Sequence, residues 1–133
     1  FKSYLSLKKK LRKRETYDIM DKYEYINEMY IMHYIQMLDM DRKKKFVGKN
    51  ITFLDICSAP GGFSNYIIKK SKNNLGYGIS LDINKGGLAN MLNNKRYKFY
   101  YYDIMEDGDK IKNILKDKKI DFIIHGCHDM TED

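Results

Sequence analysis

The spacing of apolar residues changes near residue 50 and divides the chain into two parts. Over residues 16–41, this spacing is three or four positions, which puts the side chains on one face of a helix. The pattern predicts one long helix, or two in succession, with the apolar face turned toward a core. The side chains on this face are Ile19, Tyr23, Ile26, Tyr30, Tyr34 and Met37.

From residue 51 onward, short apolar runs alternate with segments of helical character. The runs at 51–56, 77–81, 97–102 and 120–124 are rich in residues that favour strands. The segments between them, 63–72, 85–94 and 109–117, are predicted to be helices. This alternation predicts an α/β fold with a parallel sheet and right-handed crossovers. The sheet is expected to be truncated after its fourth strand, which leaves that strand as an unpaired edge.

The two parts define the expected domain organisation. Residues 1–50 are interpreted as a basic and helical extension, and residues 51–133 as a partial α/β domain. A chain of 133 residues with 43% hydrophobic residues can bury one core, which excludes a multidomain protein. No apolar run approaches the roughly 18 to 20 residues that cross a bilayer, so no membrane segment is expected. The two cysteines, Cys57 and Cys127, form no paired motif, and we expect thiols and an intracellular protein.

Basic residues are concentrated in two clusters within a net charge of +7. Residues 1–14 contain seven bases and no acid, and residues 42–50 contain five bases and no acid. Residues 15–41, between them, contain seven acids and one base. Clustered lysine and arginine attract the phosphates of nucleic acids, which favours an RNA or DNA partner. A lysine-rich composition imposed by the genome is the alternative explanation.

Residues 55–64, DICSAPGGFS, follow the first predicted strand and open the next helix. Glycines here let the backbone approach a ligand, and the free N–H groups of the first helical turn face it. A Gly-Gly pair alone is weak evidence, because ordinary turns between a strand and a helix also use it. The complete ten-residue string is more specific and indicates a small cofactor.

This string resembles the first motif of the FtsJ-like family of S-adenosylmethionine-dependent RNA 2'-O-methyltransferases. The likeness continues through residues 76–82 (GYGISLD), 102–104 and 121–124, so that it covers roughly residues 51–128. The resemblance implies a Rossmann-like methyltransferase fold, S-adenosylmethionine as the cofactor and RNA as the partner. The implied reaction is methylation of a ribose hydroxyl in rRNA or in an mRNA cap.

The resemblance also implies which residues bind the cofactor. Asp82 would accept hydrogen bonds from ribose hydroxyls, and Asp103 would contact the adenine amino group. Capping of their own loops is the alternative role for both carboxylates. Residues of the first motif would surround the methionine part of the cofactor, and these are Asp55, Ser58, Ala59, Pro60, Gly61, Gly62 and Phe63.

The chain departs from the family at the catalytic positions. The family uses a Lys-Asp-Lys-Glu set, but Gly126 stands where its aspartate belongs, and residues 27–41 contain no lysine. Lys22 and residues 43–45 remain possible substitutes, and the second lysine and the glutamate would follow residue 133. A metal or a base at His125, Cys127 and His128 is an alternative that we do not favour. No catalytic residue and no metal are therefore assigned.

Three functions follow, in order of preference. The first is RNA ribose 2'-O-methylation, and the second is a non-catalytic RNA-binding or scaffold domain that keeps the methyltransferase fold. The third is an α/β domain with another nucleotide ligand. Three explanations are open for the unpaired edge of the fourth strand: a longer gene product with further strands, a protein partner that covers the edge, or a degenerate relative that no longer catalyses.

Overall fold

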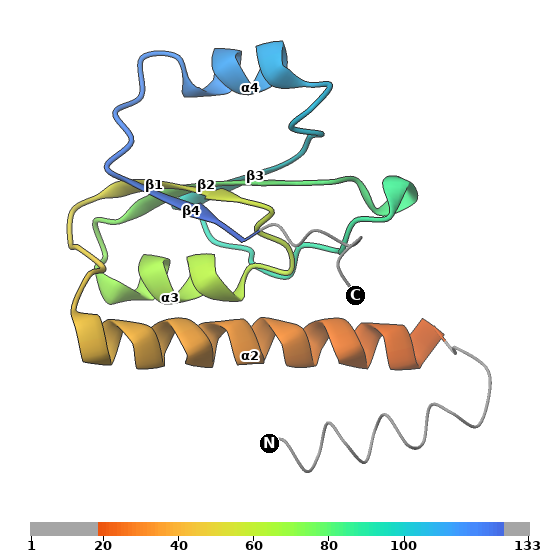
Figure 1. Ribbon diagram of the computed structural model, residues 1–133, viewed down its shortest axis with the longest axis horizontal. Coiled ribbons are helices and arrows are strands. Elements are labelled where there is room, and N and C mark those ends of the chain that lie inside the picture. The colour runs from red at the N-terminus through yellow and green to blue at the C-terminus, as the bar shows by residue number, and fades with distance from the viewer. Residues whose placement is uncertain (1–18, 127–133) are drawn as a thin grey trace.

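The computed structural model describes residues 19–126, with side chains from residue 24 onward (Figure 1). The basic segment 1–14 and residues 127–133 therefore lie outside the described residues. The elements in chain order are α2 (Ile19–Lys44), β1 (Thr52–Ile56), α3 (Gly62–Lys70), β2 (Leu75–Ser80), the 3-10 turn η1 (Ile83–Lys85), β3 (Tyr97–Tyr101), α4 (Gly108–Leu115) and β4 (Phe122–His125).

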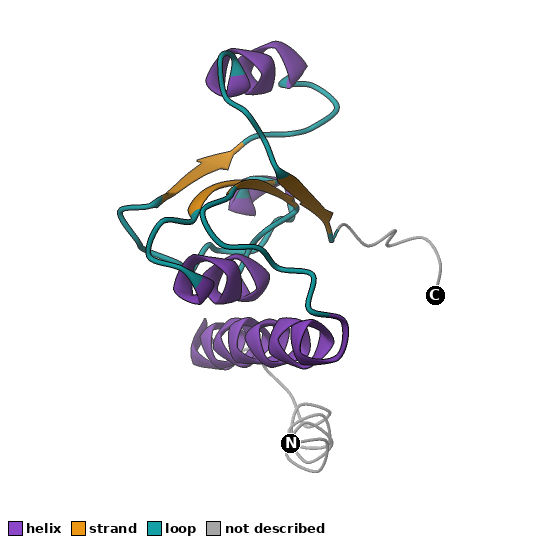
Figure 2. Ribbon diagram, turned by 90° about the vertical axis from the view of Figure 1, so that its left-hand side faces the viewer, coloured by secondary structure: helices purple, strands orange, loops and turns teal. Residues whose placement is uncertain are grey.

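The four strands form one parallel sheet in the order β3-β2-β1-β4. Helix α4 covers one face of this sheet, and α3 covers the other, with α2 packed beneath α3 (Figures 1 and 2). Phe53 on β1 is level with Gly76 on β2 and with Phe122 on β4. The predicted α/β fold, the four strands and the N-terminal helix are confirmed, and α2 is one helix rather than two.

Each face of the sheet has its own apolar core because side chains alternate along a strand. On the α3 face, Phe53 packs with Ile67 and Ile68 of α3 and with Met37 of α2. On the α4 face, Leu54, Tyr77 and Ile79 pack against half-buried residues of α4. Met37 therefore shares a core with the sheet, although the division of the chain at residue 50 stays a prediction.

The predicted helix at residues 85–94 is wrong. The chain makes only the 3-10 turn η1, which ends at Gly86 with φ at 94°. A Cβ at Gly87 would overlap the carbonyl oxygen of Leu81, so the backbone turns back on itself at this point. The two glycines stop the helix because one adopts left-handed backbone and the other makes a contact that no side chain allows.

A buried carboxylate closes the junction between α2 and β1. Asp41 is 2% exposed, and its Oδ1 accepts hydrogen bonds from the N–H groups of Phe46 at 3.0 Å and Val47 at 2.8 Å. Its Oδ2 accepts from the Tyr66 hydroxyl and from Lys70 Nζ at 2.7 Å, both on α3. Burial alone would raise the pKa of Asp41, but the hydrogen bonds to Lys70, Tyr66 and Val47 lower it to about 2. This network fixes α3 against the end of α2.

Within residues 19–126, no helix has the length and apolar character needed to cross a membrane.

Candidate cofactor site

The topology of the sheet places a switch point at the carboxyl end of β1. Strand β1 lies between β2 and β4, and the helices that follow β1 and β3 cover opposite faces. Open α/β sheets bind ligands at such a switch point, outside the carboxyl ends of the strands. The first motif occupies this position, because residues 57–61 form the loop that joins β1 to α3.

The loop is held close to β2. The N–H groups of Cys57 and Ser58 both donate to the carbonyl of Ile79, at 2.8 Å and 3.1 Å. Gly61 has φ at 110° and precedes α3. No described side chain caps this helix, so the first N–H groups of α3 have no side-chain acceptor. Cys57 is disulfide-bonded, so our prediction of a thiol at this position is wrong, and Cys127 lies outside the described residues.

The segment that replaces the predicted helix forms a wall beside this loop. Met91 N–H donates to the Pro60 carbonyl at 2.8 Å. A Cβ at Gly61 would lie only 3.0 Å from Leu92 Cβ and 3.2 Å from Asn90 Oδ1. Asn90 N–H in turn donates to the Tyr101 hydroxyl on β3 at 3.0 Å. The loops after β1 and β2 are therefore connected to each other and to the end of β3.

Gly62 has a packing role that the sequence did not reveal. A Cβ at this position would overlap the Tyr30 carbonyl oxygen, and it would lie 2.6 Å from His33 Cβ and 2.8 Å from Tyr34 N. The first turn of α3 thus touches the backbone of α2 directly. Phe63, the next residue, stacks on His33 with ring centroids 4.5 Å apart.

Asp55 lies at the base of the loop and is completely buried. Its Oδ2 accepts a hydrogen bond from Ser64 Oγ at 2.5 Å, whereas Oδ1 has no hydrogen-bond partner among the described residues. Burial raises the pKa of Asp55 to about 7, and the Ser64 hydrogen bond offsets part of the increase. Burial therefore favours the protonated form of this carboxyl group at pH values where an exposed aspartate is ionised.

Tyr97 is a site residue that the sequence analysis missed. Tyr97 is the first residue of β3, and its ring extends along the sheet toward Gly78. A Cβ at Gly78 would overlap the Tyr97 hydroxyl, and this same Cβ would lie 2.7 Å from Ser58 Oγ. Both of these hydroxyls are buried, without a hydrogen-bond partner among the described residues. Burial, and after it the charge of Asp55, raise the pKa of Tyr97. Gly78, within residues 76–82, was the available signal, because glycine inside a strand often marks close approach of another group.

Asp82 and Asp103 follow β2 and β3 at neighbouring positions of the same edge, since Ser80 pairs with Tyr101. Asp82 Oδ1 accepts from Asn84 N–H and Asp103 Oδ1 accepts from Met105 N–H, both at 2.9 Å. Each carboxylate therefore caps its own loop. Within residues 24–126, the second oxygen of each receives no recorded hydrogen bond, which leaves one acceptor available to a ligand.

Among the described residues, no other side chain takes the place of the missing catalytic residues of the family. Gly126 lies near the ring of Phe63, whose Cε2 would be 3.8 Å from a Cβ at this position. Lys43 and Lys44 lie in the last turn of α2, about 15 Å along the helix from His33. They are therefore too far from the motif to substitute for the missing lysine. The side chain of Lys22 lies outside the described residues.

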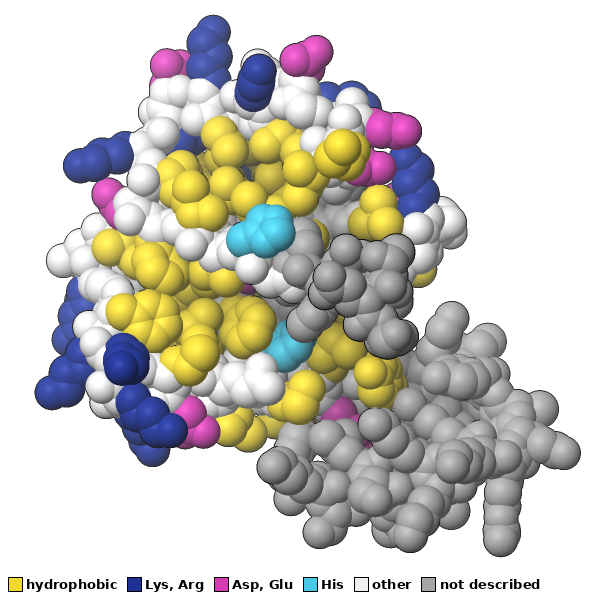
Figure 3. Space-filling view, viewed as in Figure 1, with side chains coloured by type: hydrophobic (Ala, Val, Ile, Leu, Met, Phe, Trp, Pro, Cys, Tyr) yellow, Lys and Arg dark blue, Asp and Glu magenta, His cyan; other side chains and the backbone are white. Residues whose placement is uncertain are grey.

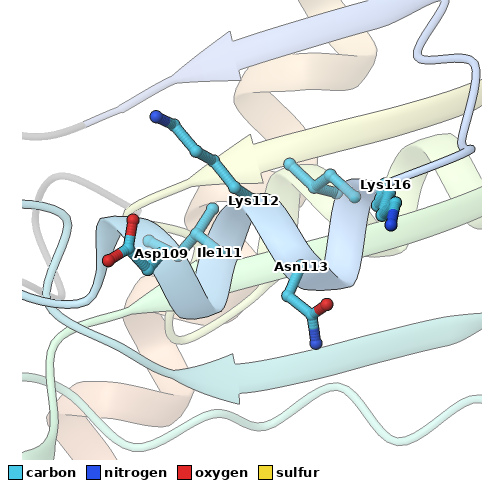
Figure 4. Close-up of a pocket in the computed structure, with 6 residues that line it drawn as sticks. Asp109, Ile111, Lys112, Asn113 and Lys116 are labelled. Carbon is cyan, nitrogen blue, oxygen red and sulfur yellow. The ribbon is translucent and has the colours of Figure 1, made fainter.

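No group of three potential metal ligands occurs among the described residues. His125 is exposed, and His128 lies outside the described range. A hollow of about 510 Å³ beside α4, lined by Ile111, Lys112 and Leu115 among others, contains no residue of the motif (Figure 4). Neither the histidines near residue 125 nor this hollow is therefore a better candidate site than the carboxyl edge of the sheet.

Comparison with known proteins identifies the class to which this fold and motif belong. The model of the FtsJ-like methyltransferase family matches residues 34–132, so the chain belongs to this family. A crystal structure of a protein from Plasmodium falciparum, assigned as a ribosomal RNA methyltransferase, is similar with a TM-score of 0.57 and 29% sequence identity. The match covers 72% of this chain and 54% of the Plasmodium chain, so this chain spans about half of that protein. No curated protein matches the chain.

Proposed function

We propose that this chain is the cofactor-binding part of an S-adenosylmethionine-dependent RNA ribose 2'-O-methyltransferase that acts on rRNA or on an mRNA cap. The observation that carries the proposal is the pair of carboxylates Asp82 and Asp103 where the neighbouring strands β2 and β3 end; within residues 24–126, one oxygen of each accepts no hydrogen bond. Members of the family generally use S-adenosylmethionine. The match to an rRNA methyltransferase supports RNA as the partner.

The residues of the site fit the chemistry of this cofactor. The free oxygen of Asp82 can accept from ribose hydroxyls, and that of Asp103 can accept from an adenine amino group. The methionine part would lie against Ser58, Ala59, Pro60, Gly61, Gly62 and Phe63, with Asp55 beneath them. When bound, the cofactor would supply an electrophilic methyl group on its sulfonium, held by these residues at the carboxyl end of β1.

A second candidate function is a non-catalytic RNA-binding or scaffold domain. Gly126 favours it, because a glycine has no carboxylate with which to hold a catalytic lysine in place. Methyl transfer from labelled S-adenosylmethionine to RNA separates the two. We expect label in RNA at alkali-resistant linkages, since methylation removes the 2'-hydroxyl that attacks the phosphate. Cofactor binding without transfer would support the scaffold instead.

Replacement of Asp82 tests the pocket. Asp82→Ala is expected to weaken cofactor binding by about 1 to 3 kcal/mol, because it leaves ligand hydroxyls without their acceptor. Isothermal titration measures the affinity. Asp82→Asn is the matched control, since its side-chain oxygen can still accept from Asn84 N–H and preserve the turn. A loss with both variants supports ligand contact, whereas a loss with alanine alone indicates that Asp82 acts only as a loop cap.

Among the described residues, β4 pairs with β1 alone, so its other edge has no strand partner there. On the face of the sheet next to this edge, Ile123 is 61% exposed, although it pairs with the buried Leu54 of β1. We propose that further strands or a protein partner cover this edge. We further propose that the protein acts inside the cell, where its RNA partner occurs.

A further inference from the structure

Exposed lysines from three separate loops lie at the amino edge of the sheet, opposite the candidate cofactor site. Lys49 precedes β1, Lys72 precedes β2 and Lys95 precedes β3, and all three are exposed. We call these three residues the amino-edge lysine cluster. Figure 3 shows Lys and Arg side chains on the left, where α2 and α3 end in Figure 1, and the last turns of these two helices contribute basic residues of their own to this side.

Buried polar side chains hold the three loops together. Asn74, which is fully buried, donates to the Gly48 carbonyl at 3.1 Å, and its Oδ1 accepts from Ile51 N–H at 3.0 Å. This joins the first loop to the second. Arg96 Nη1 donates to the carbonyls of Ser71 at 2.8 Å and Asn74 at 2.9 Å, which joins the third loop to the second. The lysines therefore stand on a fixed scaffold rather than on independent loops.

The described carboxylates at this edge have other partners: Asp121, which precedes β4, accepts from Thr52 N–H at 2.9 Å and lies 4.0 Å from Lys119 Nζ. Within residues 24–126, none of the three lysines has a recorded ion pair. The carboxylate of Asp41, at the end of α2 beside the first of these loops, is 2% exposed and already paired with Lys70. A lysine in the last turn of a helix is stabilised by the helix dipole, which accounts for its presence without a ligand. That explanation does not apply here, since all three lysines lie outside helices.

We propose that the amino-edge lysine cluster binds phosphates of the RNA substrate at a distance from the methylated nucleotide. The inference rests on the proposed function and specifies its substrate class. A strand of five residues spans about 15 Å, so one RNA that contacts both edges of the sheet extends several nucleotides from its target. The substrate is then an extended or folded RNA rather than an isolated cap.

The test compares two triple variants of equal charge. One replaces Lys49, Lys72 and Lys95 with alanine, and the control replaces Lys110, Lys112 and Lys116 of α4 and its C-cap, also exposed. The probe is a single-stranded RNA of about 30 nucleotides, titrated by fluorescence anisotropy over a series of salt concentrations. We expect the slope of log K for RNA binding against log salt concentration to be smaller in magnitude by about 2 in the cluster variant, because each lost phosphate contact changes the slope by about 0.7. The control should keep the wild-type slope.

Equal slopes in all three proteins, or an equal loss in both variants, would overturn the inference, because neither outcome assigns a site to the cluster. The same holds if the wild-type protein does not bind the RNA. The proposed function is judged separately, from methyl transfer by the wild-type protein. If RNA binding depends on the cluster but the wild-type protein transfers no methyl group, the phosphate site is supported and the enzymatic function is rejected.

Discussion

Gly62→Ala is expected to destabilise the fold by about 3 kcal/mol or more. The new methyl group would overlap the Tyr30 carbonyl oxygen and would lie 2.8 Å from Tyr34 N, both backbone atoms of α2. A flexible side chain can rotate away from such a contact, but helical backbone cannot, so α3 must separate from α2. Overpacking usually costs about 1 to 3 kcal/mol, and a backbone clash lies at or above the upper limit. Since domains of this kind are stable by only about 5 to 15 kcal/mol, the loss is readily measured.

Urea unfolding followed by circular dichroism measures the effect, and Gly108→Ala provides the matched control. Gly108 begins α4, and a Cβ there would meet no atom within 4 Å. Alanine at that position is expected to be neutral or to stabilise the fold by up to about 1 kcal/mol. Equal midpoints for the two variants would contradict the close packing of α2 on α3. A large loss for Gly62→Ala alone would show that residues before position 50 support the α/β domain.

The strands could be predicted from sequence because each is a short apolar run with a turn on either side. The carboxylates that follow them could be predicted too, since parallel strands bring their carboxyl ends to one edge. Asp82 and Asp103 follow neighbouring strands in the structure for this reason. The family was recognisable because residues 55–64 resemble its first motif and the likeness continues through residues 76–82, 102–104 and 121–124.

Other features depended on contacts between residues distant in sequence. Residues 85–94 include Gly86, Gly87 and three asparagines, which disfavour a helix locally. The sequence does not show, however, that Gly87 lies against the Leu81 carbonyl or that the following residues pack on the Pro60 loop. The place of Tyr97 depends on the register of β2 against β3, which puts its hydroxyl in the space left by Gly78. Local propensity contains no information on either contact.

Asp55→Asn is expected to make the protein more stable than the wild type above pH 7. The pKa of Asp55 rises from an ordinary value of 3.8 to about 7 on folding, because the carboxyl group is completely buried. A raised carboxyl pKa contributes stability that is fully present below about pH 4 and is lost as the pH rises through 7. Asparagine cannot ionise, and its side-chain oxygen can still accept from Ser64 Oγ. It therefore avoids the cost of a buried charge.

The measurement is the urea midpoint of both proteins between pH 5 and pH 8. Wild-type stability should fall across this range by about 2 to 4 kcal/mol, at 1.36 kcal/mol for each unit of pKa shift, while the asparagine variant loses much less. Asp41 does not obscure the comparison, because its lowered pKa of about 2 confines its effect to more acidic solutions. A parallel decline in both proteins would show that other groups cause the loss and that Asp55 stays ionised in the folded protein. A decline in the wild type alone would identify a carboxyl group that titrates near neutral pH directly beneath the candidate cofactor loop.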